Sequence, residues 1–328
     1  MNRRALLAVG AALLVAALPL RAQRSRRAYR VGFVIGGSET SPDARRFLRQ
    51  FTEGMRELGY RQGRDYGMAV RYYGSDRSRI AKLADELIAK RPDVLVANVS
   101  STAVVLKAKT ATIPIVMATA IDPVGEGLVE SLARPGGNLT GMTSLSQELH
   151  AKLVELTLLL MPKARRIAFL VNPDHVLAKS HQAVAGEAAG AQKAKLLAMQ
   201  VRAARDADTL ADRLVKAQAD ALIVSADAVL FGLRERIVEA ALEAGVPTIA
   251  VLAEFAAAGA LASYGPDVAA NFRGAARYVD RILKGARPGE LAIEQPTQFE
   301  LVLNMKTATA MRIDIPHSLL LRADRVIE

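Results

Sequence analysis

One rhythm runs through this sequence and constrains its fold more than any other feature: short β-branched runs alternate with longer amphipathic stretches. The runs are apolar throughout, which is typical of parallel strands covered on both faces. The stretches between them place apolar residues three or four apart and predict helices. The rhythm occurs twice, with strands expected to begin near 31, 68, 93 and 113, and again near 167, 196, 220 and 247.

The expected elements follow from this pattern and from the Gly and Pro residues that interrupt it. The predicted strands cover 29–36, 66–73, 93–99, 113–119, 166–172, 195–201, 220–225 and 247–252. The predicted helices cover 44–58, 79–90, 102–110, 148–160, 176–193, 208–218 and 229–244. A turn-rich region separates the halves around 122–138, and the tail adds 260–264, a helix at 268–283 and a strand at 298–304.

Two such halves predict the fold class α/β, with two doubly wound Rossmann-like lobes of mostly parallel sheet. Lobes of this kind form a ligand cleft where the C-terminal ends of their strands face each other. We expect the first lobe to comprise 28–121 plus about 266–293, and the second 122–265 plus about 294–328.

The first 22 residues predict a signal peptide. Arg3 and Arg4 precede an apolar stretch from Ala5 to Leu18, which is shorter than the ~20 residues that a membrane span needs. Export through the general pathway and through the twin-arginine pathway both fit this segment. Its removal lowers the 44 basic residues to 41 against 33 acidic ones, so the formal charge falls from +11 to +8. The mature protein is expected in the periplasm.

Several classes of function are disfavoured by what the sequence contains. With no Cys there is no disulfide framework, thiol nucleophile or acylated anchor. Basic residues alternate with acidic ones and aromatic residues are 5%, which argues against nucleic acid as a partner. We found no dinucleotide, phosphate-loop or nucleophile-elbow motif, so no enzyme activity and no cofactor are expected. The four His are interpreted as solvated residues at helix ends, and no metal site is expected.

Polar residues follow several predicted strands of the first half. Ser38 follows the first strand, and Ser100, Ser101 and Thr102 open the helix after the third. Hydroxyl and N–H groups at a helix start can bind a carboxylate or another anion, although Ser101 could equally serve only as a helix cap. The fourth strand is followed by two further candidates, Thr119 and Asp122.

The second half offers different chemistry at the matching positions. Asn172 follows its first strand and Asp227 follows its third, where the acid could receive an ammonium group or cap the helix from Val229. Tyr264 could stack on a ligand or pack in the core. Anion-binding groups in one lobe and an acid in the other would suit a zwitterion such as an amino acid.

Several stretches together resemble the ABC-transporter substrate-binding family that includes tryptophan- and tyrosine-binding members. The similar region runs from about Tyr29 to Glu328. The stretches are IPIV at 113–116, DPVG at 122–125, GLVESLARPGGNLTG at 127–141, GALASYG at 259–265, ILKG at 282–285, EQPTQFELVLN at 294–304 and IPHSLLLRAD at 315–324.

This resemblance implies a type I periplasmic-binding-protein fold with three crossings between lobes. It implies a monomer that captures a small solute by hinge closure and delivers it to an inner-membrane ABC permease. It also implies that Ser100, Ser101 and Thr102 hold a ligand carboxylate, that Asp227 meets its amino group, and that Tyr264 can line an aromatic ligand. An alternative is a periplasmic protein that reports ligand binding to a membrane receptor.

Overall fold

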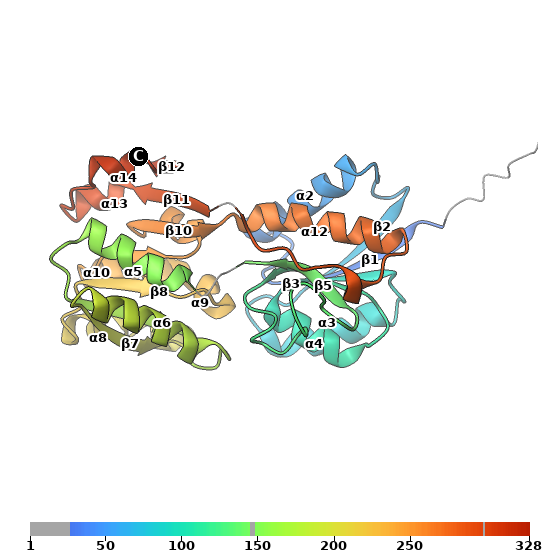
Figure 1. Ribbon diagram of the computed structural model, residues 1–328, viewed down its shortest axis with the longest axis horizontal. Helices are drawn as coiled ribbons and strands as arrows, with labels where there is room; N and C mark the ends of the chain where they lie inside the picture. The colour runs from blue at the N-terminus through green and yellow to red at the C-terminus, as the bar shows by residue number, and fades with distance from the viewer. Residues whose placement is uncertain (1–26, 145–147, 298) are drawn as a thin grey trace, which may run out of the picture.

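The structure is a computed structural model that describes residues 27–144, 148–297 and 299–328. The expected signal peptide, residues 1–22, lies outside the described residues. The described chain forms two α/β lobes side by side, each with a sheet between layers of helices (Figure 1). The fold class expected from the sequence is therefore confirmed.

The first lobe is built on a five-stranded sheet whose strands are all parallel. Its order is β2-β1-β3-β4-β5. The strands are β1 (Tyr29–Ile35), β2 (Tyr66–Tyr72), β3 (Val94–Val99), β4 (Ile115–Ala120) and β5 (Leu139–Thr143). The helices of this lobe are α2 (Pro42–Glu57), η1 (Arg77–Arg79), α3 (Ile80–Ile88), α4 (Ser100–Lys109) and α12 (Val268–Leu283), followed by η2 (Pro288–Glu290).

The second lobe repeats this order and extends it. Its sheet runs β12-β11-β10-β9-β8-β6-β7, and only the β10–β11 pair is antiparallel. The strands are β6 (Arg166–Val171), β7 (Lys195–Gln200), β8 (Ala221–Val224), β9 (Thr248–Ala250), β10 (Ala262–Pro266), β11 (Phe299–Asn304) and β12 (Arg325–Ile327). The helices are α5 (Leu149–Leu160), α6 (Ala178–Ala191), α7 (Ala204–Ala207), α8 (Leu210–Lys216), α9 (Ala228–Gly232), α10 (Arg234–Glu243), α11 (Ala253–Ala257), α13 (Met305–Ala310) and α14 (His317–Leu320).

The apolar strands are buried on both faces, which explains why they lack a polar alternation. On β1, Val31, Phe33 and Ile35 face the layer formed by α2 and α12, whereas Val34 faces α3 and α4. Phe33 lies edge-on to a Phe of α2 and stacks with Phe272 of α12 at 6.2 Å between ring centroids. The residue 268–283 helix, distant in sequence, therefore completes the core of the first lobe (Figure 1).

The first lobe extends further along the chain than the expected limit at residue 121. β5 pairs in parallel with β4 and directly follows the turn-rich region at 122–138, in a stretch where the sequence analysis predicted no strand. Gly141 allows this close pairing, since a Cβ on it would lie 2.1 Å from the carbonyl oxygen of Met117, and its φ is +137°. The chain then passes between the lobes three times, between β5 and α5, between β10 and α12, and between η2 and β11.

The described residues contain neither a membrane-spanning helix nor a cluster of metal ligands. No helix in the described ranges is long and apolar enough to cross a membrane. Within the same ranges, no group of three or more His, Asp or Glu side chains could hold a metal ion.

Candidate ligand-binding cleft

A cleft of about 740 Å³ lies between the two lobes, at the C-terminal ends of their parallel strands. This is the position at which open α/β sheets bind ligands, because loops and helix starts there leave polar groups unpaired. The first-lobe wall includes Gly36, Gly37, Tyr73, Arg77, Asn98, Ser100, Ser101 and Thr119. The second-lobe wall includes His175, Arg202, Asp227, Val229, Phe231, Leu233, Arg234 and Leu252.

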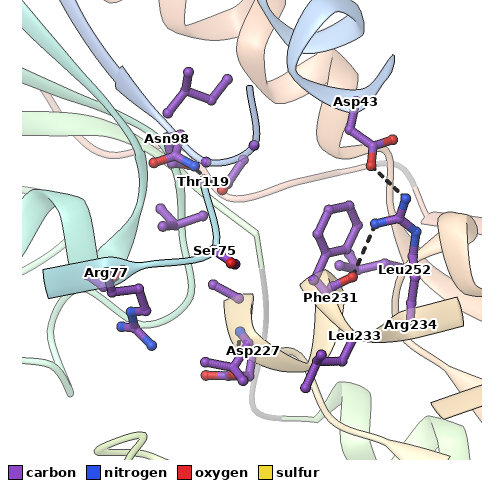
Figure 2. Close-up of a pocket in the computed structure, with 18 of the residues that line it drawn as sticks. Asp43, Ser75, Arg77, Asn98, Thr119, Asp227, Phe231, Leu233, Arg234 and Leu252 are labelled. Carbon is purple, nitrogen blue, oxygen red and sulfur yellow. Dashed lines mark hydrogen bonds and ion pairs between the residues drawn. The ribbon is translucent and has the colours of Figure 1, made fainter. Parts of the chain in front are cut away.

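Asn98 is the centre of a hydrogen-bond network on the first wall, where Thr119 lies beside it (Figure 2). Its Nδ2 donates to Tyr73 Oη at 3.4 Å, and its Oδ1 accepts from Thr102 Oγ1 at 2.9 Å. Thr119 Oγ1 donates to the Asn98 carbonyl at 2.6 Å. Thr102 is fully buried behind the wall, so it positions Asn98 and does not line the cleft.

Ser100 and Ser101 open α4 on the same wall. Ser100 Oγ accepts from the N–H of Ile121 at 3.0 Å, which joins the start of α4 to the end of β4. The Oγ of Ser101 is buried and has no hydrogen-bond partner among the described residues. The helix-cap position belongs to Val99, which makes no side-chain cap. Ser101 therefore presents a hydroxyl that the helix itself does not use.

Asp227 lies on the opposite wall and is 5% exposed. Its Oδ1 accepts from the N–H groups of Val229 at 2.7 Å and Leu230 at 3.1 Å, so it caps α9 as the sequence allowed. Its Oδ2 accepts from Asn172 Nδ2 at 3.2 Å. Asn172 is itself buried and positions the acid without lining the cleft.

Three sequence candidates lie elsewhere. Ser38 is exposed beside the cleft and shares a 3.0 Å hydrogen bond with Thr40. Asp122 turns away to accept from the N–H of Gly125 at 2.9 Å. Tyr264 stacks on Phe299 with 5.8 Å between centroids and packs against the second-lobe core, which agrees with the packing alternative.

The structure adds an apolar and charged corner that sequence analysis missed. Arg234 forms ion pairs with Asp43 of α2 at 2.8 Å and with Glu235 at 2.9 Å, and its guanidinium lies 4.7 Å from the centroid of the Phe231 ring (Figure 2). The helix expected over 229–244 is interrupted at Leu233, which separates α9 from α10. Phe231 and Arg234, on either side of this interruption, line the cleft. Gly232 was the one residue in the sequence that indicated an interruption here.

A second pair joins the lobes deeper in the molecule. Glu126, after β4, has a side chain that is 3% exposed, and its Oε1 lies 3.6 Å from Nε2 of His175 in the second lobe. Burial raises the pKa of Glu126 to about 7, with nearby Asp122 adding to the rise and a hydrogen bond to Ser100 opposing it. Burial also lowers the pKa of His175, although the negative charge of Asp227 opposes this effect.

Three of the four histidines are not the solvated residues that we expected, whereas His317, at the start of α14, is exposed. His150 and His181 are buried and stack at 4.1 Å between centroids, and His181 lies 5.8 Å from His175. Burial lowers the pKa of His181 to about 3, with further contributions from His150 and His175. These rings are therefore packing elements beside the cleft wall.

Known proteins resemble this chain in sequence and in fold. A tyrosine-binding protein from Clostridioides difficile strain R20291 is 25% identical over 271 residues, 82% of this chain and 77% of that protein. The crystal structure of a conserved domain protein from Vibrio cholerae superposes with a TM-score of 0.85 at 27% identity, covering 92% of this chain and 100% of that one.

A crystal structure of an ABC domain in complex with L-Trp, from Streptococcus pneumoniae, has the same fold with a TM-score of 0.83 at 24% identity; the superposition covers 92% of this chain and 100% of that one. Residues 41–327 match the family of ABC transporter substrate binding proteins. The two lobes, the three crossings and the cleft at the strand ends thus have their counterpart in a known group. This chain belongs to the ABC transporter substrate-binding protein family and has the type I periplasmic-binding-protein fold.

Proposed function

We propose that this protein is the periplasmic solute-binding component of an ABC importer, and that it captures an amino acid or an aromatic acid by hinge closure. The observation that carries the proposal is the cleft of about 740 Å³, whose two walls come from different lobes and bear complementary groups. A pocket of this size accommodates a small organic molecule. The tyrosine-binding relative and the L-Trp complex support an aromatic amino acid as a first choice.

Each wall is assigned one end of a zwitterion. On the first lobe, Ser101 Oγ and the N–H groups at the start of α4 would receive the carboxylate, because a helix start favours negative charge. On the second lobe, Oδ2 of Asp227 would accept from the ammonium group. Thr119 and Asn98 would keep the first wall in place, and Asn172 would do the same for Asp227.

Ion pairs between the two lobes support the proposal of hinge closure. Arg46 of α2 pairs with Glu254 of α11 at 2.7 Å, and Asp43 pairs with Arg234 at 2.8 Å. Both pairs join the lobes beside the cleft. A ligand that touches both walls favours this state because its contacts to the two lobes exist together only there.

We further propose a role in transport that goes beyond membership of the family. The loaded protein would act as a monomer in the periplasm, deliver its solute to a permease in the inner membrane, and leave the solute chemically unchanged. Two units, residues 28–143 with 267–293 and residues 148–266 with 299–328, would then move as rigid lobes about the three crossings.

The test begins with native mass spectrometry of the purified protein, to detect a solute that co-purifies. Thermal shift with L-tyrosine, L-tryptophan, other amino acids and aromatic acids follows, since a ligand at 100 times its Kd adds about 2.7 kcal/mol of stability. We expect S101A and D227N to weaken binding at least tenfold, while S38A, outside the cleft, leaves it unchanged. Equal binding by all three variants would refute the assigned site, and a solute recovered in altered form would refute a pure binding role.

A further inference from the structure

Three arginines line the cleft, and two of them already have acidic partners. Arg234 pairs with Asp43 and Glu235, and Arg202 pairs with Asp174 at 3.3 Å. The third, Arg77, is half-buried on the first-lobe wall. Its guanidinium makes no hydrogen bond or ion pair with any residue in the ranges that the structure describes. A guanidinium has five N–H donors, so a partly desolvated and unpaired one is an unfilled position for an anion.

The local backbone structure holds Arg77 on the cleft wall, and the neighbouring acid forms no ion pair with it. It begins η1, the single 3₁₀ turn that follows β2. The acid next to it in sequence, Asp76, uses one oxygen to accept from the N–H of Ser78 at 3.0 Å and from its Oγ at 2.6 Å. The turn before η1 is fixed by a bridge between Gly74 and Gly37. The neighbouring carboxylate is therefore used as a cap, and Arg77 extends along the cleft wall (Figure 2).

The charge of Arg77 acts across the cleft. It lowers the pKa of His175 in the second lobe, while Asp227 raises it, so Arg77 and Asp227 each lie within electrostatic reach of His175. The carboxylate of Asp227 already accepts three hydrogen bonds, from Val229, Leu230 and Asn172. The structure shows no ion pair between Arg77 and Asp227, which lie on opposing walls of the cleft (Figure 2).

We propose that Arg77 is a specificity-determining residue that pairs with a carboxylate of the solute. This inference rests on the function proposed above and adds a charge requirement to it. Hydroxyl and backbone N–H donors can bind neutral groups as well as anions, whereas a guanidinium forms two parallel, charge-assisted bonds with a carboxylate. The solute class is then carboxylic acids, amino acids included, in preference to amides, esters and neutral sugars.

The test compares acids with their matched amides in the full-length mature protein. The probes are L-tyrosine with L-tyrosinamide, L-tryptophan with L-tryptophanamide, and benzoate with benzamide, each measured by calorimetry or thermal shift. The variants are R77Q, which removes the charge, and R77K, which keeps the charge but lacks the planar fork. The matched control is R79Q, an exposed arginine of the same 3₁₀ turn that does not line the cleft.

We expect the wild type to bind at least one acid more tightly than its amide. R77Q should lose about 10- to 100-fold in affinity for that acid and almost nothing for the amide, which corresponds to one charge-assisted contact. R77K should fall between, and R79Q should match the wild type. Melting temperatures without solute identify any variant that fails to fold, and R77K then serves as the test.

Three results would overturn the inference: an acid bound equally well by R77Q and wild type, amides bound as well as acids by the wild type, or no acid bound at all. Binding of neutral solutes alone would reject the role of Arg77 and leave solute capture intact. Absence of binding by any solute, charged or neutral, would count against the proposed function as well.

Discussion

Glu126 should make the stability of the protein depend on pH in a defined direction. Its carboxyl is buried between the lobes against His175, and its pKa rises from an ordinary 4.5 to about 7. A carboxyl with a raised pKa favours the folded state when it is protonated. Its contribution is therefore fully present below pH 4.5 and is lost as the pH rises through 7. Glu126→Gln removes this titration and keeps a side chain of similar shape.

The size of the effect follows from the two pKa values. The difference between them corresponds to about 3 kcal/mol in total, at roughly 1.4 kcal/mol for each pH unit. Between pH 5 and pH 8.5 the linkage relation gives about 2–3 kcal/mol. From pH 5 to pH 8.5, we expect the free energy of unfolding of E126Q to rise by that amount relative to the free energy of unfolding of the wild type. Groups that do not contact Glu126 titrate in both proteins and cancel in the comparison.

The assay is urea unfolding followed by circular dichroism at several pH values from 5 to 8.5. The matched control is E130Q, since Glu130 is an exposed acid on the same connection. Its stability should run parallel to that of the wild type at every pH. If E126Q also runs parallel to the wild type within about 0.5 kcal/mol, Glu126 is ionised at no cost in the folded state, and the reasoning from burial fails.

Three further predictions test other parts of the structure. His175→Gln should raise stability at pH 5 more than at pH 7.5, because burial lowers the pKa of His175 and the native state disfavours its charged form; an equal change at both pH values would contradict this. Gly141→Ala should prevent folding or cost more than about 3 kcal/mol in urea unfolding, whereas Gly190→Ala, with open space around it in a helix, should stabilise by about 0.5–1 kcal/mol. Glu254→Gln should shift the lobes toward an open form and enlarge the radius of gyration in solution scattering, since it breaks the 2.7 Å pair with Arg46; an unchanged radius would argue against that pair as a closing contact.

The sequence predicted the fold well where burial dictates composition. Runs such as Tyr29–Ile35 can only be strands covered on both faces, and their spacing indicated the repeated lobes. It failed at β5, because Leu139–Thr143, although fully buried, contains two Thr and a Gly in place of an apolar run, and Gly141 is required by the close approach to β4. The change of lobe was consequently expected at residue 121, before the last strand of the first sheet.

The sequence located several cleft-lining residues by their place at the end of a strand, and their role in binding stays a prediction. Ser101, Thr119 and Asp227 all line the cleft, as strand-end residues of parallel sheets do. Arg77 and Arg234 could not be found in this way, because their importance depends on which acids lie nearby in three dimensions. Arg234 has an acidic partner in the other lobe, whereas Arg77 has none among the described residues, and no local sequence pattern distinguishes the two arginines.

The path of α12 has a consequence for how the chain becomes native. Residues Val268–Leu283 return from the second lobe to cover one face of the first sheet, and strands β11 and β12 then return to the second. Neither lobe is a contiguous segment, so a chain emerging from its N-terminus cannot bury Phe33 and Phe51 against Phe272 until more than four-fifths of it is available. Such long-range closure slows folding. The face of the first sheet that α12 covers thus acquires its core late, whereas the second-lobe cluster between Ala168 and Ala260 needs no later residue.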